Sequence, residues 1–291
     1  MGGNVEDSRP DQEPDVESGA ARSAPEDPLL AERLGAPAHP RDIYMEESRL
    51  YRPIATGDIF QGVDVPGASS DEAGHDLTMV IAHPSAMRKR AALAPRARAA
   101  PVTPINGLRL RHWSPGYFDV YPLPLLSTVA QENGFDIANR GWAALIEVAA
   151  PVETVQLQVT RRIVCLSPKG IHLLLQRIVH SDTRYAVKED FLARVFEVKL
   201  DELEMLQTWN EELVAPLALE GEPLLVALRE AAKEFDDWLT GTRGSDGQSL
   251  RDLLDGGQAS GEVHRRVHGE IRTRRSLDER GQVAHSPSYE A

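Results

Sequence analysis

The fold of this chain is predicted outward from one segment, GHDLTMVIAHPSAMRKRAALAPRARAAPVTPI (Gly74–Ile105). It opens with the apolar run Leu77–Ala82, which is short and rich in strand-forming residues and therefore predicts a buried strand. The chain then turns at His83-Pro84 into an arginine-rich loop and returns through Pro101–Pro104. A core strand that leads directly into a cationic loop is an arrangement suited to holding an anion.

The charge of this region is opposite to that of the whole chain. The 291 residues carry a formal net charge of −13, yet no Asp or Glu occurs between Leu77 and Phe118. The basic residues of this run are Arg88, Lys89, Arg90, Arg96, Arg98, Arg109 and Arg111. An acidic chain does not bind nucleic acid indiscriminately, so the run predicts a local contact with single-stranded RNA or another polyanion. A merely solvated loop is the alternative interpretation.

Cysteine content and hydropathy indicate a cytoplasmic protein. The single cysteine, Cys165, allows no intrachain disulfide, and a reducing compartment is therefore expected. Its place in the apolar run Ile163–Leu166 favours a buried structural thiol over a nucleophile. No apolar stretch approaches the ~18–20 residues of a membrane span, and the acidic N-terminus does not have the pattern of a signal peptide. We expect no membrane partner.

The composition divides the chain into four parts. Residues 1–41 hold nine acids against four arginines and few bulky apolar side chains, which predicts a disordered acidic tail. Residues 42–182 are predicted to form a β-rich domain with an insertion near 106–140. Residues 183–240 are predicted to be a helical extension packed on that domain. Residues 241–291 are rich in Gly, Ser and Arg and are predicted to be mostly disordered.

Several strands and helices are predicted within these parts. The strand candidates are Ile59–Val65, Leu77–Ala82, Ala143–Val148, the alternating run Thr154–Thr160, and Ile163–Leu166, whereas Trp113–Leu125 is predicted to be a structured loop. Ser167-Pro168 is a strong helix start, since serine caps and proline suits the first helical position. Further helices are predicted at Lys188–Val198, Asp201–Val214 and Glu222–Leu239. Val263–Leu277 could form a short basic helix on a partner, because a helix of this length is marginal alone.

Short motifs in the β-rich part carry a family resemblance. Gly57-Asp58-Ile59 is followed by an acidic-glycine loop, Asp71–His75, and then by the hydrophobic strand. Ala144–Ile146, Arg161-Arg162 and the helix after Ser167 follow further on. Over about residues 55–180 the chain resembles the MazF/PemK family of endoribonuclease toxins. The resemblance implies an α+β protein with an SH3-like small β-barrel, here with added C-terminal helices and two disordered tails.

The resemblance also implies a function and its partners. Members of this family are bacterial toxin–antitoxin proteins, usually homodimers, which cut single-stranded RNA without a metal ion and are held by an antitoxin partner. The family's catalytic arginine lies just after Gly-His, where this chain has Asp76, and Leu77 replaces the proline that follows. A carboxylate cannot replace a cation that stabilises phosphorane charge. The family's threonine has a counterpart in Thr103.

Other residues could still supply nuclease chemistry. Metal-free cleavage needs a base, an acid and cations near the phosphate, and His83, Arg88 and Thr103 suit these roles. His75 and Asp76 form a base and its orienting partner only if the loop brings them together. A turn role for His83 and a strand-edge role for Asp76 are the more common alternatives. We expect neither a cofactor nor a metal site, because no Cys/His set has zinc spacing and no phosphate-binding glycine motif is present.

Trp113 follows the basic run closely. An exposed aromatic ring beside a cationic groove holds a base by stacking, at ~1–3 kcal/mol per base. A buried ring that fixes the loop to the domain is the commoner alternative. Three hypotheses remain from the sequence: a divergent RNA-contacting protein, a non-catalytic protein-interaction module within a toxin–antitoxin or defence system, and an active metal-independent endoribonuclease with rearranged residues.

Overall fold

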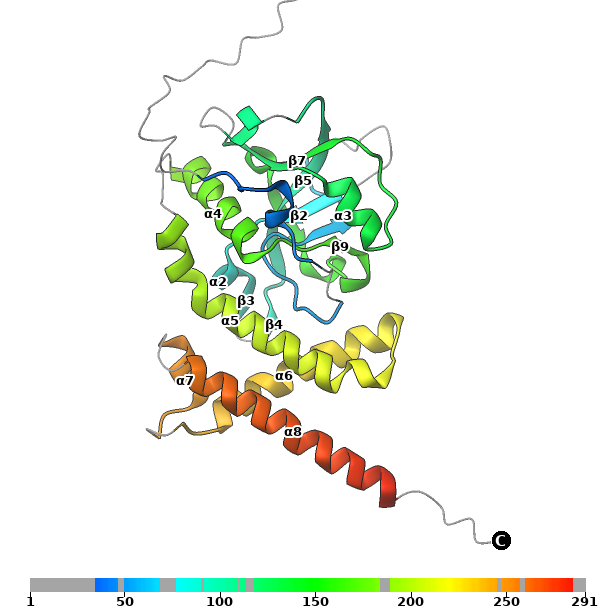
Figure 1. The fold of residues 1–291 in the computed structure, drawn as a ribbon, viewed down its shortest axis with the longest axis vertical. Coiled ribbons are helices and arrows are strands. Elements are labelled where there is room, and N and C mark those ends of the chain that lie inside the picture. The colour runs from blue at the N-terminus through cyan, green and yellow to red at the C-terminus, as the bar shows by residue number, and fades with distance from the viewer. Residues whose placement is uncertain are drawn as a thin grey trace, which may run out of the picture.

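The chain folds into a sheet unit followed by a helical unit in the computed structural model (Figure 1). The structure describes residues 35–46, 50–68, 77–89, 92–108, 110–113, 118–183, 189–244, 247–256 and 260–284. The strands are β1 (Ile59–Gln61), β2 (Leu77–Val80), β3 (Arg88–Lys89), β4 (Ala92–Leu93), β5 (Arg96–Ile105), β6 (Val120–Leu123), β7 (Gly141–Leu145), β8 (Ala150–Glu153) and β9 (Arg162–Val164). The principal helices are α2 (Pro84–Met87), α3 (Leu126–Glu132), α4 (Pro168–Thr183), α5 (Glu189–Leu213), α6 (Gly221–Gly241), α7 (Leu250–Asp255) and α8 (Ser260–Ala284), and the class is therefore α+β as predicted.

The antiparallel sheet is organised around the long strand β5. The strand order is β6-β7-β5-β2-β1-β9, with β8 also paired to β5. Val102 lies opposite Ala144, whereas Ala99, three residues earlier, lies opposite Ala150, six residues later. The three additional residues are accommodated where the short helix Ile146–Val148 interrupts the edge between β7 and β8.

The predicted barrel closure is not found. Among the strands that the structure describes, β6 and β9 end the sheet without pairing to each other, so the sheet is open. The prediction of a half-solvated strand over Thr154–Thr160 was wrong. Thr154 leaves the ladder because its hydroxyl donates to the carbonyl oxygen of Ala94 at 2.6 Å, and two 3-10 turns follow, which leave Val155 79% exposed. Conversely, the predicted loop Trp113–Leu125 contains β6.

Two predictions for the sheet unit are confirmed: the buried strand at Leu77 and the helix that starts at Ser167-Pro168. All four residues of β2 are buried, as the apolar run predicts. Ser167 caps α4, since its Oγ accepts a hydrogen bond from the Gly170 N–H at 3.1 Å, and Pro168 occupies the first helical position. Gly35 already bonds to Gln176, so described structure begins before residue 42.

The helical unit has its own core. The two helices predicted between residues 188 and 214 form one continuous helix, α5, which packs against α4, α6 and α8 (Figure 1). The largest buried side chains of this core are Trp209 and Phe235. In the described residues no helix has an apolar stretch that is long enough to cross a bilayer.

The prediction of mostly disorder after residue 241 is corrected by α7 and α8. Val263, Val267 and Ile271 are spaced four residues apart and are at most 3% exposed, which places one stripe of α8 in the second core. The polar composition concealed this stripe, because only one residue in four of the helix has to be apolar for it to pack. Helix α8 is held by its own chain and does not need a separate partner to be buried.

Candidate functional site

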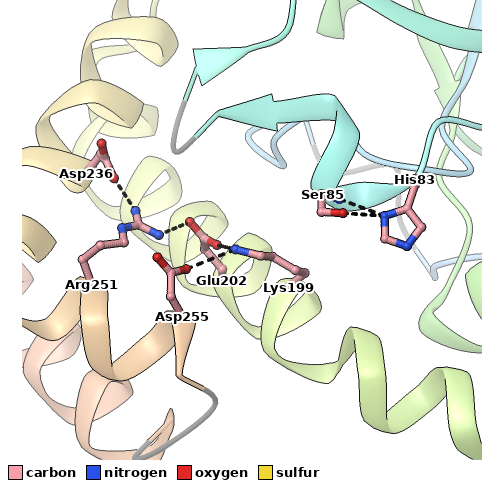
Figure 2. A network of polar contacts seen from close by, with 7 residues as sticks. All are labelled: His83, Ser85, Lys199, Glu202, Asp236, Arg251 and Asp255. Carbon is pink, nitrogen blue, oxygen red and sulfur yellow. Dashed lines mark hydrogen bonds and ion pairs between the residues drawn. The ribbon is translucent and has the colours of Figure 1, made fainter.

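His83 and Arg88 lie at opposite ends of α2. His83 is the N-cap, and its Nδ1 accepts from the Ser85 N–H at 3.3 Å and lies 2.6 Å from Ser85 Oγ (Figure 2). Partial burial lowers the pKa of His83 below its usual value of 6.5. Arg88 turns inward and donates to the carbonyl oxygen of Ile54 at 3.1 Å. Burial lowers the pKa of Arg88 to about 10.

Thr103 is not brought to this pair. In the β2–β5 register Val80 lies opposite Ala99; His83 comes three residues after Val80, and Thr103 lies four residues from Ala99 in the opposite direction. His83 and Thr103 are therefore about seven residues apart along the strand direction, which corresponds to a separation on the order of 20 Å. His75 and Asp76 lie outside the described residues.

Two described arginines of the basic run, Arg96 and Arg98, are partnered with acids that are distant in sequence. Arg96 and Arg98 lie on β5 and not on a loop. Arg96 Nε is 2.6 Å from Glu153 Oε1, and Arg98 NH1 is 2.8 Å from Asp182 Oδ2. Arg90, Arg109 and the side chains of Lys89 and Arg111 lie outside the part that the structure describes.

Trp113 and Cys165 are core residues. Trp113 is 8% exposed, meets Tyr121 edge-on, and carries the Arg177 guanidinium 4.9 Å from its ring centre, so its faces are not open to a base. Burial raises the pKa of the Cys165 thiol to about 12, which keeps it protonated at neutral pH. Within the described residues, no group of three or more His, Cys, Asp or Glu side chains could hold a metal ion.

A cavity of about 630 Å³ lies between the two units, and we call it the junction cavity. One wall comes from the segment Tyr51–Ile54, the β3–β4 hairpin and the turns around Leu157, and the other from α5 and α6. The apolar side chains of its lining include Leu93, Leu157, Val159, Leu206, Leu225 and Leu228. Its volume is within the range of ligand-binding sites.

Arg52 is a buried cation in the lining of this cavity. It is 6% exposed, its buried Nε has no hydrogen-bond partner among the described residues, and none of their ion pairs includes it. The backbone of Arg52 is held by Arg162, which forms a buried ion pair with Asp58. The N–O distance of this pair is 2.8 Å, and its side chains are 0% and 1% exposed. Arg162 NH2 also donates to the carbonyl oxygen of Arg52 at 2.8 Å.

Two further polar groups converge on the same four-residue segment, Tyr51–Ile54. Asn210 of α5 is 3% exposed and donates through Nδ2 to the carbonyl oxygen of Tyr51 at 2.9 Å, while its Oδ1 has no partner among the described residues. Arg88 binds the carbonyl oxygen of Ile54 at the other end. Arg52, Arg88 and Asn210 therefore gather at one end of the junction cavity.

The acids of the cavity lining are already neutralised. Glu222 pairs with Arg229 at 3.1 Å, and Asp236 pairs with Arg251. Lys233 on α6 also lines the cavity and forms no ion pair with the described residues. The local balance therefore favours an anion, although the chain as a whole is acidic.

A smaller cavity of about 160 Å³ adjoins the first and shares Ile54, Arg88 and Leu206 with it. A chain of ion pairs runs along it from Asp236 through Arg251 and Glu202 to Lys199 (Figure 2). The Arg251–Glu202 and Lys199–Glu202 distances are 2.6 Å and 3.1 Å. Burial raises the pKa of Glu202, but the two cations outweigh it, and the pKa is lowered overall. This network joins α5, α6 and α7.

The sequence predicted a polyanion contact that includes Arg88, but it did not point to Arg52 or Asn210, which share the cavity lining with it. Both lie outside the arginine-rich run, and neither belongs to a motif. For Arg52, the sequence feature that could have drawn attention is its position directly before Pro53, ahead of the first predicted strand. Comparison with known proteins adds no relative: no family model matches the chain, and no curated protein matches it.

Proposed function

We propose that this chain is a non-catalytic binding protein that holds an anionic ligand in the junction cavity. The observation that carries the proposal is Arg52, a buried arginine that lines the cavity, has no hydrogen-bond partner for its Nε and forms no ion pair among the described residues. An arginine stays charged in proteins, and burying a charge without a partner is costly. A bound anion removes that cost, so the site favours anions over neutral ligands.

The geometry gives less support to catalysis. Of the residues suited to RNA cleavage, His83 caps a short helix, Arg88 binds a backbone carbonyl, and Thr103 lies at the far end of the β2–β5 pair. General acid–base chemistry needs groups within hydrogen-bond reach of one reacting centre.

We further propose that the sheet unit is a divergent, opened form of the MazF/PemK-type barrel. Support comes from Gly57-Asp58 directly before β1, from the antiparallel pairing of β1, β2 and β5, and from the capped helix after β9. Gly57 has φ +87°, and a Cβ there would lie 2.8 Å from the Leu166 side chain, so the fold itself demands this glycine.

Two fluorescent probes of matched shape test the anion site. 8-Anilinonaphthalene-1-sulfonate carries a sulfonate, and N-phenyl-1-naphthylamine is its uncharged counterpart. We expect saturable binding to the folded protein with at least a tenfold preference for the sulfonate. Arg52→Met should abolish this preference, whereas Arg96→Met, at a surface ion pair outside the cavity, should leave it unchanged. Equal binding of the two probes, or an unaltered preference in Arg52→Met, would refute the proposal.

RNA contact remains a second candidate, favoured by the acid-free run from Leu77 to Phe118. Counterion release makes the affinity of such contacts fall steeply with salt. Filter binding of single-stranded RNA at 50 and 200 mM salt tests it, and an affinity that does not depend on salt would remove this candidate. A protein partner such as an antitoxin would be found by binding that persists in high salt.

A further inference from the structure

The junction cavity combines a polar end with a long apolar wall. Arg52, Arg88 and Asn210 all contact or belong to the Tyr51–Ile54 segment, so these three polar groups lie together, while the charged lining residues of α6 include two ion-paired acids. The rest of the lining is dominated by aliphatic side chains from both units. A site of this kind matches a ligand whose charge is confined to one end.

The apolar wall is built by one stripe of α6. Leu225, Leu228 and Ala232 are spaced by three and four residues, which places them on one face of the helix, and all three line the cavity. Seven residues of helix span about 10 Å. Leu93, Leu157 and Val159 line it from the sheet unit. Both walls of the cavity therefore contribute apolar side chains, and those of α6 extend over that length.

We infer that the ligand of the junction cavity is a single-chain anionic amphiphile, with its head at Arg52 and Arg88 and its tail along the α6 stripe. The inference rests on the proposed anion site and adds the chemistry of the tail. Two arginines suit a carboxylate or a phosphate, because the planar guanidinium forms paired hydrogen bonds with either group. Asn210 Oδ1 can accept a hydrogen bond from a protonated phosphate oxygen or an ordered water beside the head.

The exposed surroundings of the mouth agree with this orientation. Val155, which also lines the cavity, is 79% exposed, and Lys233 is exposed on the opposite wall. A tail that emerges past Val155 would cover this apolar side chain. A polyanion would instead place charge along the whole length of the cavity, against the aliphatic walls.

A chain-length series tests the inference by calorimetry. The probes are hexanoate, octanoate and decanoate, with decyl phosphate, 1-decanol and decyltrimethylammonium for the head, all below micelle formation. Each added methylene that is buried should tighten binding about fourfold up to the length of the channel. The two uncharged or cationic probes should bind at least tenfold more weakly than decanoate. Decanoate binding much tighter than decyl phosphate assigns a carboxylate head, and the reverse assigns a phosphate head.

Two variants on α6 separate the tail from the head. Ala232→Phe fills the channel and should remove the gain between octanoate and decanoate while hexanoate binds as before. Val226→Phe, on a residue that does not line the cavity, should bind the whole series like the wild type. Circular dichroism checks that each variant is folded.

The failure of this inference can be distinguished from that of the anion site. If the sulfonate probe binds through Arg52 but affinity is the same for hexanoate and decanoate, the amphiphile assignment is wrong and the anion site stands. An acidic peptide would then be the remaining occupant. If Arg52→Met changes the binding of none of the probes, both proposals are wrong.

Discussion

The buried Arg162–Asp58 ion pair should be among the most sensitive points of the sheet unit. Arg162 Nη1 and Asp58 Oδ2 are 2.8 Å apart, and the side chains are 0% and 1% exposed. Arg162 also donates to the carbonyl oxygens of Pro53 and Arg52, at 3.3 and 2.8 Å, and Asp58 accepts from the Ala55 N–H at 2.9 Å. The pair therefore joins β9 to the segment that forms one wall of the junction cavity.

Arg162→Met is the informative change because it keeps the length of the side chain and removes its charge. The Asp58 carboxylate then stays buried with the Ala55 N–H as its backbone donor. The carbonyl oxygens of Arg52 and Pro53 lose the donor that Arg162 supplied. Breaking a buried pair in this way costs about 3–5 kcal/mol of the free energy of unfolding. For a chain of 291 residues, at about 2.1 cal/mol/K of unfolding entropy per residue, that corresponds to a fall in Tm of about 5–8 °C.

Urea denaturation followed by tryptophan fluorescence measures the cost. The double variant Arg162→Met/Asp58→Asn removes the stranded charge, and we expect it to be more stable than Arg162→Met alone. Arg96→Gln is the control, because the Arg96–Glu153 pair is 70% and 46% exposed and should contribute less than about 1 kcal/mol. A loss below about 1 kcal/mol in Arg162→Met, or strictly additive single changes, would show that the pair does not act as described.

Three further outcomes are expected. Gly170→Ala should destabilise the protein by about 1–3 kcal/mol in urea denaturation, because its Cβ would lie 2.2 Å from the Ile43 carbonyl oxygen, whereas Gly269→Ala, with no atom within 4 Å, should stabilise α8 by up to about 1 kcal/mol. The lowered pKa of Glu202 means that its ion pairs stabilise the fold above pH 4.5 and lose this contribution as the pH falls through the folded-state pKa. Glu202→Gln should therefore narrow the difference in urea midpoint between pH 7 and pH 3.5. Single-stranded RNA incubated with EDTA and the wild type should remain intact, and cleavage that disappears in both His83→Ala and Arg88→Ala would contradict the non-catalytic proposal.

The elements that could be predicted are those whose signal is local. In three elements the residues that form the structure are neighbours in sequence. These are the apolar run of β2, the Ser167-Pro168 cap of α4 and the periodic apolar residues of α6. A short helix within α8 was predicted, but its length and its packing on its own chain were not, because its apolar stripe occupies one residue in four of a polar segment. Its stability comes from α5, which no local pattern contains.

Arg88 excepted, the proposed anion site lies apart from the basic run that the sequence pointed to. The absence of acids around Arg96 and Arg98 suggested free cations, yet their partners Glu153 and Asp182 lie 57 and 84 residues away in sequence. A local count of charges cannot detect such pairs. The same fold that neutralises these arginines leaves Arg52 buried without an ion pair among the described residues.

The Gly57-Asp58 motif connects the fold to this site. Gly57 is required because a side chain there would collide with Leu166, and Asp58 is required because it neutralises Arg162. Arg162 in turn holds the Arg52 carbonyl at 2.8 Å and so fixes the backbone that presents the Arg52 guanidinium to the cavity. The motif that suggested a nuclease family therefore acts, in this chain, as a support for the proposed binding site. It follows that Asp58→Asn should weaken anion binding even where the protein remains folded, although Asp58 itself does not line the junction cavity.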